Sequence, residues 1–226
     1  MKCRDTDVLL LLIHSTRDKL CQVWMMSGTS KEQECFPVHI INENLPRVVV
    51  ENVLGFHAIT GCDTVSSFAG HGKKSCWRVY LQHAELLQGV GRDGPLDKVE
   101  EFVCLLYKAP CSTSGVDRAR HDLFQKGKKA IEMLPPTSDA LELHLSRANH
   151  QAKVWLQANK SDVVIPSPQE TGGWQVMDKR LEVVWLQKPS VPSSCSELVT
   201  CGCKTKCCTH LHLSSEGATM YICMRL

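Results

Sequence analysis

The chain has 226 residues, of which 43% are hydrophobic and 22% charged, and its formal net charge is +2. This composition is typical of a globular protein and excludes a chain that is disordered throughout. The small net charge excludes a uniformly basic nucleic-acid-binding chain, so a surface for nucleic acid must come from local clustering of lysine and arginine. The apolar run Val8–Ile13 is too short to span a bilayer, and Met1–Asp5 lacks the layout of a signal peptide. We therefore expect no membrane partner and a nuclear or cytoplasmic protein that is not secreted.

The first quarter of the chain is expected to combine helices with short strands. The run from Val8 to His14 is so uniformly apolar that its periodicity does not separate a helix from a buried strand. The elements expected after it are a strand over 22–26, a turn over 27–30, a strand over 35–41, a loop over 42–45, and a helix that starts at Pro46 and runs to a corner at Gly61.

The rest of the chain is expected to consist of helices joined by turns and linkers. The most regular helix follows Thr137 or Ser138, where Leu141, Leu145, Ala148, Ala152 and Trp155 form one apolar stripe and Arg147, His150 and Lys153 lie away from it. The other expected elements are helices after Lys73, around 99–106 and over 117–126, a glycine-rich turn over 89–95, linkers over 166–173 and 189–196, and a short apolar helix or strand over 181–187.

Two acidic segments carry the main chemical signal. Asp5 and Asp7 stand directly ahead of the apolar run, and Asp63 lies far along the chain in a Gly-Cys-Asp corner. Carboxylates that converge from separate segments on Mg²⁺ or Mn²⁺ ions can polarise a phosphodiester and generate hydroxide. These three residues are therefore candidate catalytic metal ligands. The alternative is structural: Asp5 caps a helix that starts near Thr6, Asp7 lies in its first turn, and Asp63 is a turn residue.

A glycine turn with two lysines follows the Gly-Cys-Asp corner. Gly70 and Gly72 allow a close approach of the backbone to a phosphate, and Lys73 and Lys74 add an attraction that is independent of sequence. These four residues are candidate nucleic-acid contacts. The alternative is an ordinary glycine turn before a solvated basic helix start. Trp77 and Tyr80, at helical spacing after the turn, are more typical of a core than of base stacking.

Together these segments resemble the second half of a PIN-like nuclease domain of the flap-endonuclease type. The resemblance is carried by Asp-Thr-Asp-Val-Leu, Thr-Gly-Cys-Asp and Gly-x-Gly-Lys-Lys, in that order. The amino-acid sequence of residues 56–77 and of the cysteine-rich end is also similar to that of transposon-associated metazoan proteins that contain such a domain. The resemblance runs from Asp5 to Cys208.

The resemblance implies a helix after the acidic block, metal binding by the three aspartates, and a helix-hairpin-helix-like grip on a DNA backbone by the glycine turn. DNA is therefore expected as a partner ahead of RNA. In PIN-like nucleases, further acidic ligands and most of the parallel sheet come from sequence ahead of the acidic block. The chain thus corresponds to the back half of an active site, and the resemblance leaves open whether it cleaves by itself.

The C-terminal residues are rich in soft metal ligands. The chain has 13 cysteines, and the seven that are scattered singly are expected to be reduced thiols. Thiolates and imidazoles at close spacing favour Zn²⁺, so the candidate zinc ligands are Cys201, Cys203, Cys207, Cys208 and His210. The Cys-x-Cys-x-x-x-Cys spacing is similar to the CXC modules of the transposon-associated proteins. The alternative is a tail of free thiols. Isolated histidines elsewhere, His57 and His144 among them, are expected at surface or core positions.

We therefore expect a mostly helical α/β chain. Its predicted parts are a partial PIN-like domain with few strands over 1–130, a helical extension with linkers over 131–194, and a cysteine-rich tail over 195–226. The predicted function is a partial, metal-dependent, PIN-like nuclease module of transposon origin. The alternative is a non-catalytic remnant that binds nucleic acid or protein.

Overall fold

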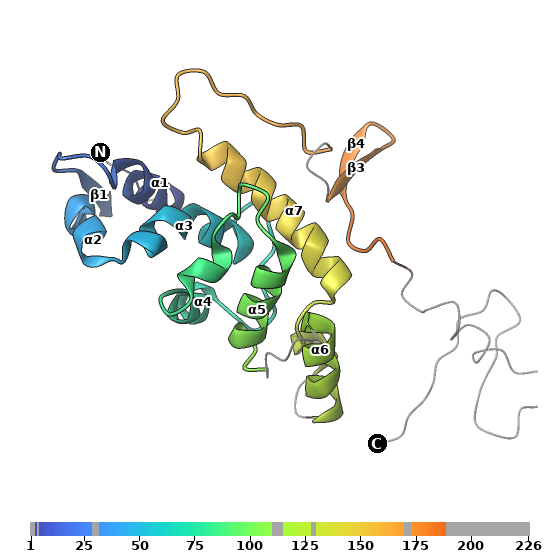
Figure 1. Ribbon diagram of the computed structural model, residues 1–226. Coiled ribbons are helices and arrows are strands. Elements are labelled where there is room, and N and C mark those ends of the chain that lie inside the picture. The colour runs from blue at the N-terminus through green and yellow to red at the C-terminus, as the bar shows by residue number, and fades with distance from the viewer. Residues whose placement is uncertain are drawn as a thin grey trace, which may run out of the picture. The chain divides into compact units, whose positions relative to one another are not determined.

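The computed structural model describes residues 3, 5–28, 32–109, 115–127, 130–169 and 173–188 (Figure 1). The chain divides into two compact units, Met1–Trp185 and Leu186–Leu226, and the fold described below is that of the first unit. The predicted tail, 195–226, lies outside the described residues. None of the described helices combines the length and apolar character needed to cross a bilayer.

The described residues form a mixed α/β fold that is about half helical, with two small antiparallel sheets. The elements are, in chain order, α1 (Thr6–Thr16), β1 (Trp24–Gly28), β2 (Gln33–Pro37), α2 (Val38–Asn44), α3 (Arg47–Ile59), α4 (Lys73–Tyr80), the 3₁₀ helix η1 (Ala84–Leu87), α5 (Leu96–Leu106), α6 (Gly115–Gln125), the 3₁₀ helix η2 (Ile131–Met133), α7 (Ser138–Trp155), β3 (Trp174–Met177) and β4 (Arg180–Val183).

Helix α3 lies at the centre of this unit and is buried along most of its length. It packs against α1, α7 and η1, and Figure 1 shows α7 running beside both α3 and α5. Phe56 of α3 stacks on Tyr80 of α4 with ring centroids 4.4 Å apart, and the Tyr80 hydroxyl donates to the carbonyl of Val49 at 2.7 Å. Burial raises the pKa of Tyr80 and keeps this donor protonated. The predicted boundary between residues 130 and 131 falls within this packed unit.

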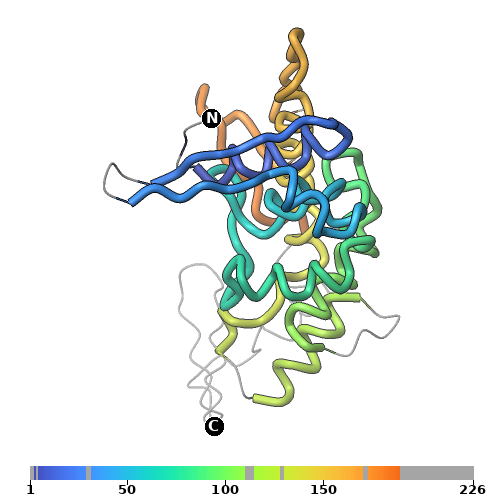
Figure 2. The backbone as a smooth tube through the Cα atoms, turned by 90° about the vertical axis from the view of Figure 1, so that its left-hand side faces the viewer, coloured from blue at the N-terminus to red at the C-terminus, as the bar shows by residue number. Residues whose placement is uncertain are grey.

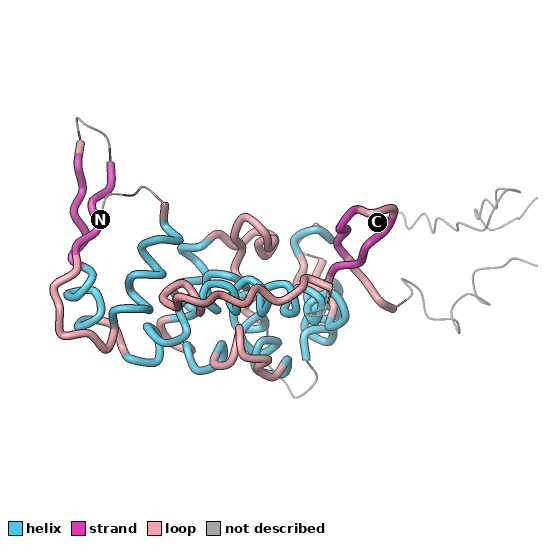
Figure 3. The backbone as a smooth tube through the Cα atoms, turned by 90° about the horizontal axis from the view of Figure 1, so that it is seen from above, coloured by secondary structure: helices cyan, strands magenta, loops and turns pink. Residues whose placement is uncertain are grey.

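Two hairpins supply the strands of this unit. β1 pairs with β2 in the register Met25 to Phe36, and Figures 2 and 3 show this hairpin projecting away from the helices. Its first strand also accepts a hydrogen bond at the carbonyl of Met26 from the N–H of Cys3, 2.8 Å away. β3 pairs with β4 in the register Val176 to Leu181. Each hairpin needs neighbouring packing to persist, since an isolated two-stranded ribbon is marginally stable in water.

The strand predicted over 35–41 and the loop predicted over 42–45 are wrong in part, because α2 occupies Val38–Asn44. Pro37 lacks an N–H and ends the strand, and Val38 then starts a helical turn. Val38, Ile41 and Leu45 belong to one apolar cluster with α3, and their spacing fits a helix. A short apolar run is ambiguous between the two periods, and tertiary packing decides it here.

Helix α7 carries a buried charge that its apolar stripe does not include. Arg147 lies off the stripe as predicted, yet it is only 3% exposed. Its Nη1 donates to the carbonyls of Val184 at 2.9 Å and Gly173 at 3.4 Å, which flank the β3–β4 hairpin. This second buried face of α7 was not predicted, because its partners follow much later in the chain.

Substitution of Gly55 tests the packing between α3 and the turn after η1. A Cβ built at Gly55 would lie 2.8 Å from Val90 Cβ and 3.0 Å from the carbonyl oxygen of Val90. Although Gly→Ala normally stabilises a helix interior, we expect Gly55→Ala to lower the free energy of unfolding by about 1–3 kcal/mol through overpacking. Gly72→Ala is the control, because a Cβ there meets nothing within 4 Å; its effect should stay below about 1 kcal/mol in the same urea titrations. Equal effects of the two substitutions would contradict this packing.

Candidate functional site

The start of α1 places the first two candidate carboxylates. Asp5 is the N-cap of the helix, and its Oδ1 accepts the N–H of Asp7 at 2.9 Å. Asp7 lies in the first turn, where a negative charge is favoured by the helix dipole. The predicted helix start is therefore confirmed. Asp5 is exposed and Asp7 is half-buried.

Asp7 reaches from α1 to the last turn of α3. Its Oδ1 accepts a hydrogen bond from His57 Nε2 at 2.6 Å, and the Trp155 ring stacks on the imidazole with centroids 5.3 Å apart. Burial lowers the pKa of His57, the nearby Lys73 ammonium lowers it further, and the bond to Asp7 opposes both. His57 is therefore neutral near pH 7, with its proton on Nε2 pointing at the carboxylate.

Lys73, at the start of α4, contacts the same end of α3. Its Nζ donates to the carbonyl of His57 at 2.6 Å and to Thr60 Oγ1 at 2.9 Å. This is a favourable position for a cation, because the carbonyls at a helix C-terminus carry partial negative charge. Burial lowers the pKa of Lys73 to about 8, while Cys62, Cys76 and Asp7 act in the opposite direction. The ammonium thus lies half-buried at the C-terminal end of α3.

We call Asp7, His57, Lys73 and Trp155 the α3-end cluster. It brings together the start of α1, the end of α3, the start of α4 and the end of α7. The acidic start of α1 thus contacts the end of α3, although 50 residues separate Asp7 from His57. His57 was expected to be isolated. The sequence holds no local signal for its role, since both of its side-chain neighbours in the cluster come from distant parts of the chain.

The corner that carries Asp63 is a tight turn with an exposed carboxylate. Cys62 and Val65 exchange two backbone hydrogen bonds across it, and Gly61 has a φ of 107°, which favours glycine. Thr64 Oγ1 donates to Gln151 Oε1 at 2.7 Å and so anchors the corner to α7.

The described carboxylates do not make up a metal centre. Among the described residues, no three His, Cys, Asp or Glu side chains form a group that could hold a metal ion. Asp5, Asp7 and Asp63 therefore do not form such a group. One oxygen of Asp5 serves the helix cap, and one oxygen of Asp7 serves His57. A two-metal site requires several carboxylates around ions a few Å apart, so the donor set described here does not fit one. The candidate zinc ligands Cys201, Cys203, Cys207, Cys208 and His210 lie outside the described residues.

The two lysines that follow the glycine turn differ in burial. Gly70 has a φ of +74°, and Gly72 stands in open space as the N-cap of α4 without a side-chain cap. Lys73 turns inward to the α3-end cluster, whereas Lys74 is exposed. Trp77 is half-buried and Tyr80 is fully buried, so the prediction that they belong to the core is confirmed.

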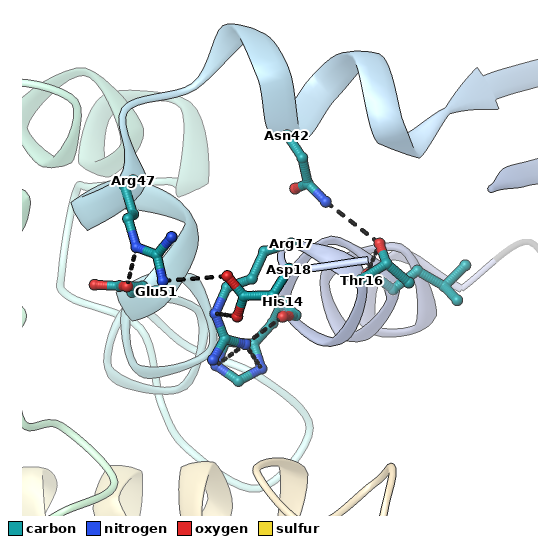
Figure 4. Close-up of polar contacts among 8 residues, drawn as sticks. His14, Thr16, Arg17, Asp18, Asn42, Arg47 and Glu51 are labelled. Carbon is teal, nitrogen blue, oxygen red and sulfur yellow. Dashed lines mark hydrogen bonds and ion pairs between the residues drawn. The ribbon is translucent and has the colours of Figure 1, made fainter. Parts of the chain in front are cut away.

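A second polar network joins the opposite end of α1 to α2 and α3 (Figure 4). Arg47 forms ion pairs with Asp18 at 3.1 Å and with Glu51 at 2.7 Å, and Asn42 Nδ2 donates to Thr16 Oγ1 at 3.3 Å. Exposed ion pairs of this kind contribute little to stability. Burial lowers the pKa of His14, within this network, to about 4, which keeps it neutral. The network positions α1 and offers no convergent site.

Opposite pKa shifts of His57 test the α3-end cluster. Asp7→Asn removes the partner that raises the pKa of His57, so we expect that pKa to fall. Lys73→Met removes a cation that lowers it, so the pKa should rise. Titration of the His57 Cε1–H resonance by NMR measures both shifts, and Lys74→Met is the matched control with no expected effect. Shifts of the same sign in the first two variants would contradict the geometry.

In comparisons with known proteins, no protein-family model, no curated protein and no solved structure matches the chain.

Proposed function

We propose that this chain is a nucleic-acid-binding module of PIN-like nuclease type that holds a phosphate backbone at the glycine turn ahead of α4. The observation that supports this function best is the α3-end cluster, which brings the acidic helix start and the glycine–lysine turn to one place. These are two of the three segments on which the resemblance to flap-type nucleases rests.

Lys73 and Lys74 have different roles in this proposal. Lys73 fixes the turn by capping α3 with its ammonium, so its contribution is positioning. Lys74 is exposed next to Gly72, where the backbone has open space on the Cβ side. An exposed cation beside an accessible backbone suits a phosphate contact that does not depend on base sequence. DNA remains the preferred partner because the turn resembles a DNA-gripping hairpin.

Cleavage of the bound strand is the second candidate function. It is favoured by the contact of Asp7 with the last turn of α3, because the corner that carries Asp63 follows the end of that helix directly. The described donor set does not fit a two-metal centre, so we assign no catalytic step to Mg²⁺ or Mn²⁺ in this chain. Zinc binding by the C-terminal cysteines and a transposon origin belong to the same proposal.

Fluorescence anisotropy with labelled flap DNA tests the proposal. We expect binding that weakens steeply between about 50 and 200 mM salt. Lys74→Ala should weaken binding about 3–10-fold and lower the slope of log K against log salt by about one. Lys160→Ala removes another exposed lysine elsewhere in the chain and is the matched control. Absence of binding at low salt, or equal affinity of the two variants, would contradict the proposed function.

The same substrate distinguishes binding from cleavage. With Mg²⁺ or Mn²⁺ added, a nuclease cuts the flap and loses that activity in Asp63→Asn, whereas a binding module leaves the flap intact in both proteins. Lys73→Ala belongs in a separate stability measurement, because loss of the ammonium leaves the carbonyl of His57 without this donor.

A further inference from the structure

A cavity of about 240 Å³ lies on the face of α7 that carries Arg147. Its walls are largely apolar and include Phe68, Leu134 and Ala140, while Ser66, His144 and Arg147 supply polar groups. Trp185 completes the lining, with its ring centroid 5.3 Å from the guanidinium carbon of Arg147. No acidic residue lines this cavity. It belongs entirely to the first unit of the chain.

Arg147 is a buried cation without a counter-charge among the described residues. It is 3% exposed, and none of the described ion pairs includes it. Backbone carbonyls accept only from its Nη1, and neither Nε nor Nη2 has a hydrogen-bond partner among the described residues. A guanidinium stays protonated when it is buried, so the charge persists. A buried charge left in this state is costly unless an anion joins it.

The two remaining donor nitrogens, Nε and Nη2, are not fully enclosed. The buried side-chain nitrogen and oxygen atoms without partners, within the described part of the chain, are Arg17 Nε and Asn42 Oδ1. Since Arg147 Nε and Nη2 also lack partners but are not among these atoms, they are not sealed from solvent. Nε and one Nη form an edge of the guanidinium that matches the two oxygens of a carboxylate.

His144 does not compete for that anion or add a second charge. Its Nε2 donates to the carbonyl of Ile59 at 2.8 Å, and its Nδ1 accepts from Ser66 Oγ at 3.4 Å. Burial lowers the pKa of His144 to about 4, so the imidazole is neutral near pH 7. Arg147 is therefore the one charged group in the lining of this cavity.

We propose that this cavity binds a small organic carboxylate, with the carboxylate on the guanidinium of Arg147 and an apolar ring or branched chain between Phe68, Ala140 and Trp185. The cavity is smaller than the roughly 300–1,000 Å³ of drug-sized sites, which limits the ligand to about one ring. This site is separate from the glycine turn and does not depend on the proposed function.

Binding of phenylacetate to the full chain, measured by calorimetry or ligand-observed NMR, tests the site. We expect phenylacetate to bind about tenfold more tightly than phenylacetamide, because a charge-assisted bidentate pair is stronger than a neutral hydrogen bond. Inorganic phosphate should bind more weakly than phenylacetate, since it lacks the apolar body. Equal binding of acid and amide, equal binding of phosphate, or no binding of phenylacetate at about 10 mM would each overturn the proposal.

Two variants separate the site from the fold. Ala140→Leu fills the cavity without removing a contact of Arg147, and it should abolish phenylacetate binding while the melting curve shows a folded protein. Arg147→Met keeps most of the side-chain stem and should remove the preference for acid over amide. Wild-type affinity in a folded Ala140→Leu variant would contradict the assignment even if Arg147→Met fails to fold.

Discussion

The fold of this chain depends on how the C-terminal end of α3 is closed. The last carbonyls of a buried helix need donors, and Lys73 donates to the carbonyl of His57 and to the side-chain hydroxyl of Thr60. The His57 side chain on the same turn is held by Asp7 from α1 and covered by Trp155 from α7. One helix end therefore fixes three other helices. A neutral imidazole suits this role, because a second cation beside Lys73 would be repelled in a half-buried site.

Lys73 and Lys74, which follow the glycine turn, differ in what they do: Lys73 positions the turn, whereas Lys74 stays exposed for the contact proposed above. A lysine that caps a helix is ordered by two hydrogen bonds, and the turn before it is ordered with it. The exposed neighbour, Lys74, is then presented from a fixed backbone. The carboxylates show the same division: Asp5 and Asp7 each give one oxygen to the protein itself. The acidic helix start and the glycine turn thus contribute much of their polar chemistry to the fold of this chain.

The sequence predicted the elements whose signals are local. Asp5 caps α1 as expected, and Thr137 caps α7 as one of the two residues expected there, because their side chains accept N–H groups two or three residues ahead. Val38–Ile41 was wrongly predicted as a strand, since a short, mostly apolar run fits either period and only packing against α3 decides between them. His57 and Arg147 were not predicted as important, because their partners stand 50 residues before and 26–37 residues after them. Local patterns reveal helix caps and cores, whereas pairing between distant polar residues depends on the completed fold.

The central claim is that Asp7 and His57 stabilise the fold as one unit at the end of α3. A double-mutant cycle of unfolding free energies on Asp7→Asn, His57→Gln and the combined variant measures this directly. A direct hydrogen bond of this kind predicts a coupling energy of about 1 kcal/mol or more at pH 7.5. Additive effects of the two substitutions, within about 0.3 kcal/mol, would contradict the claim.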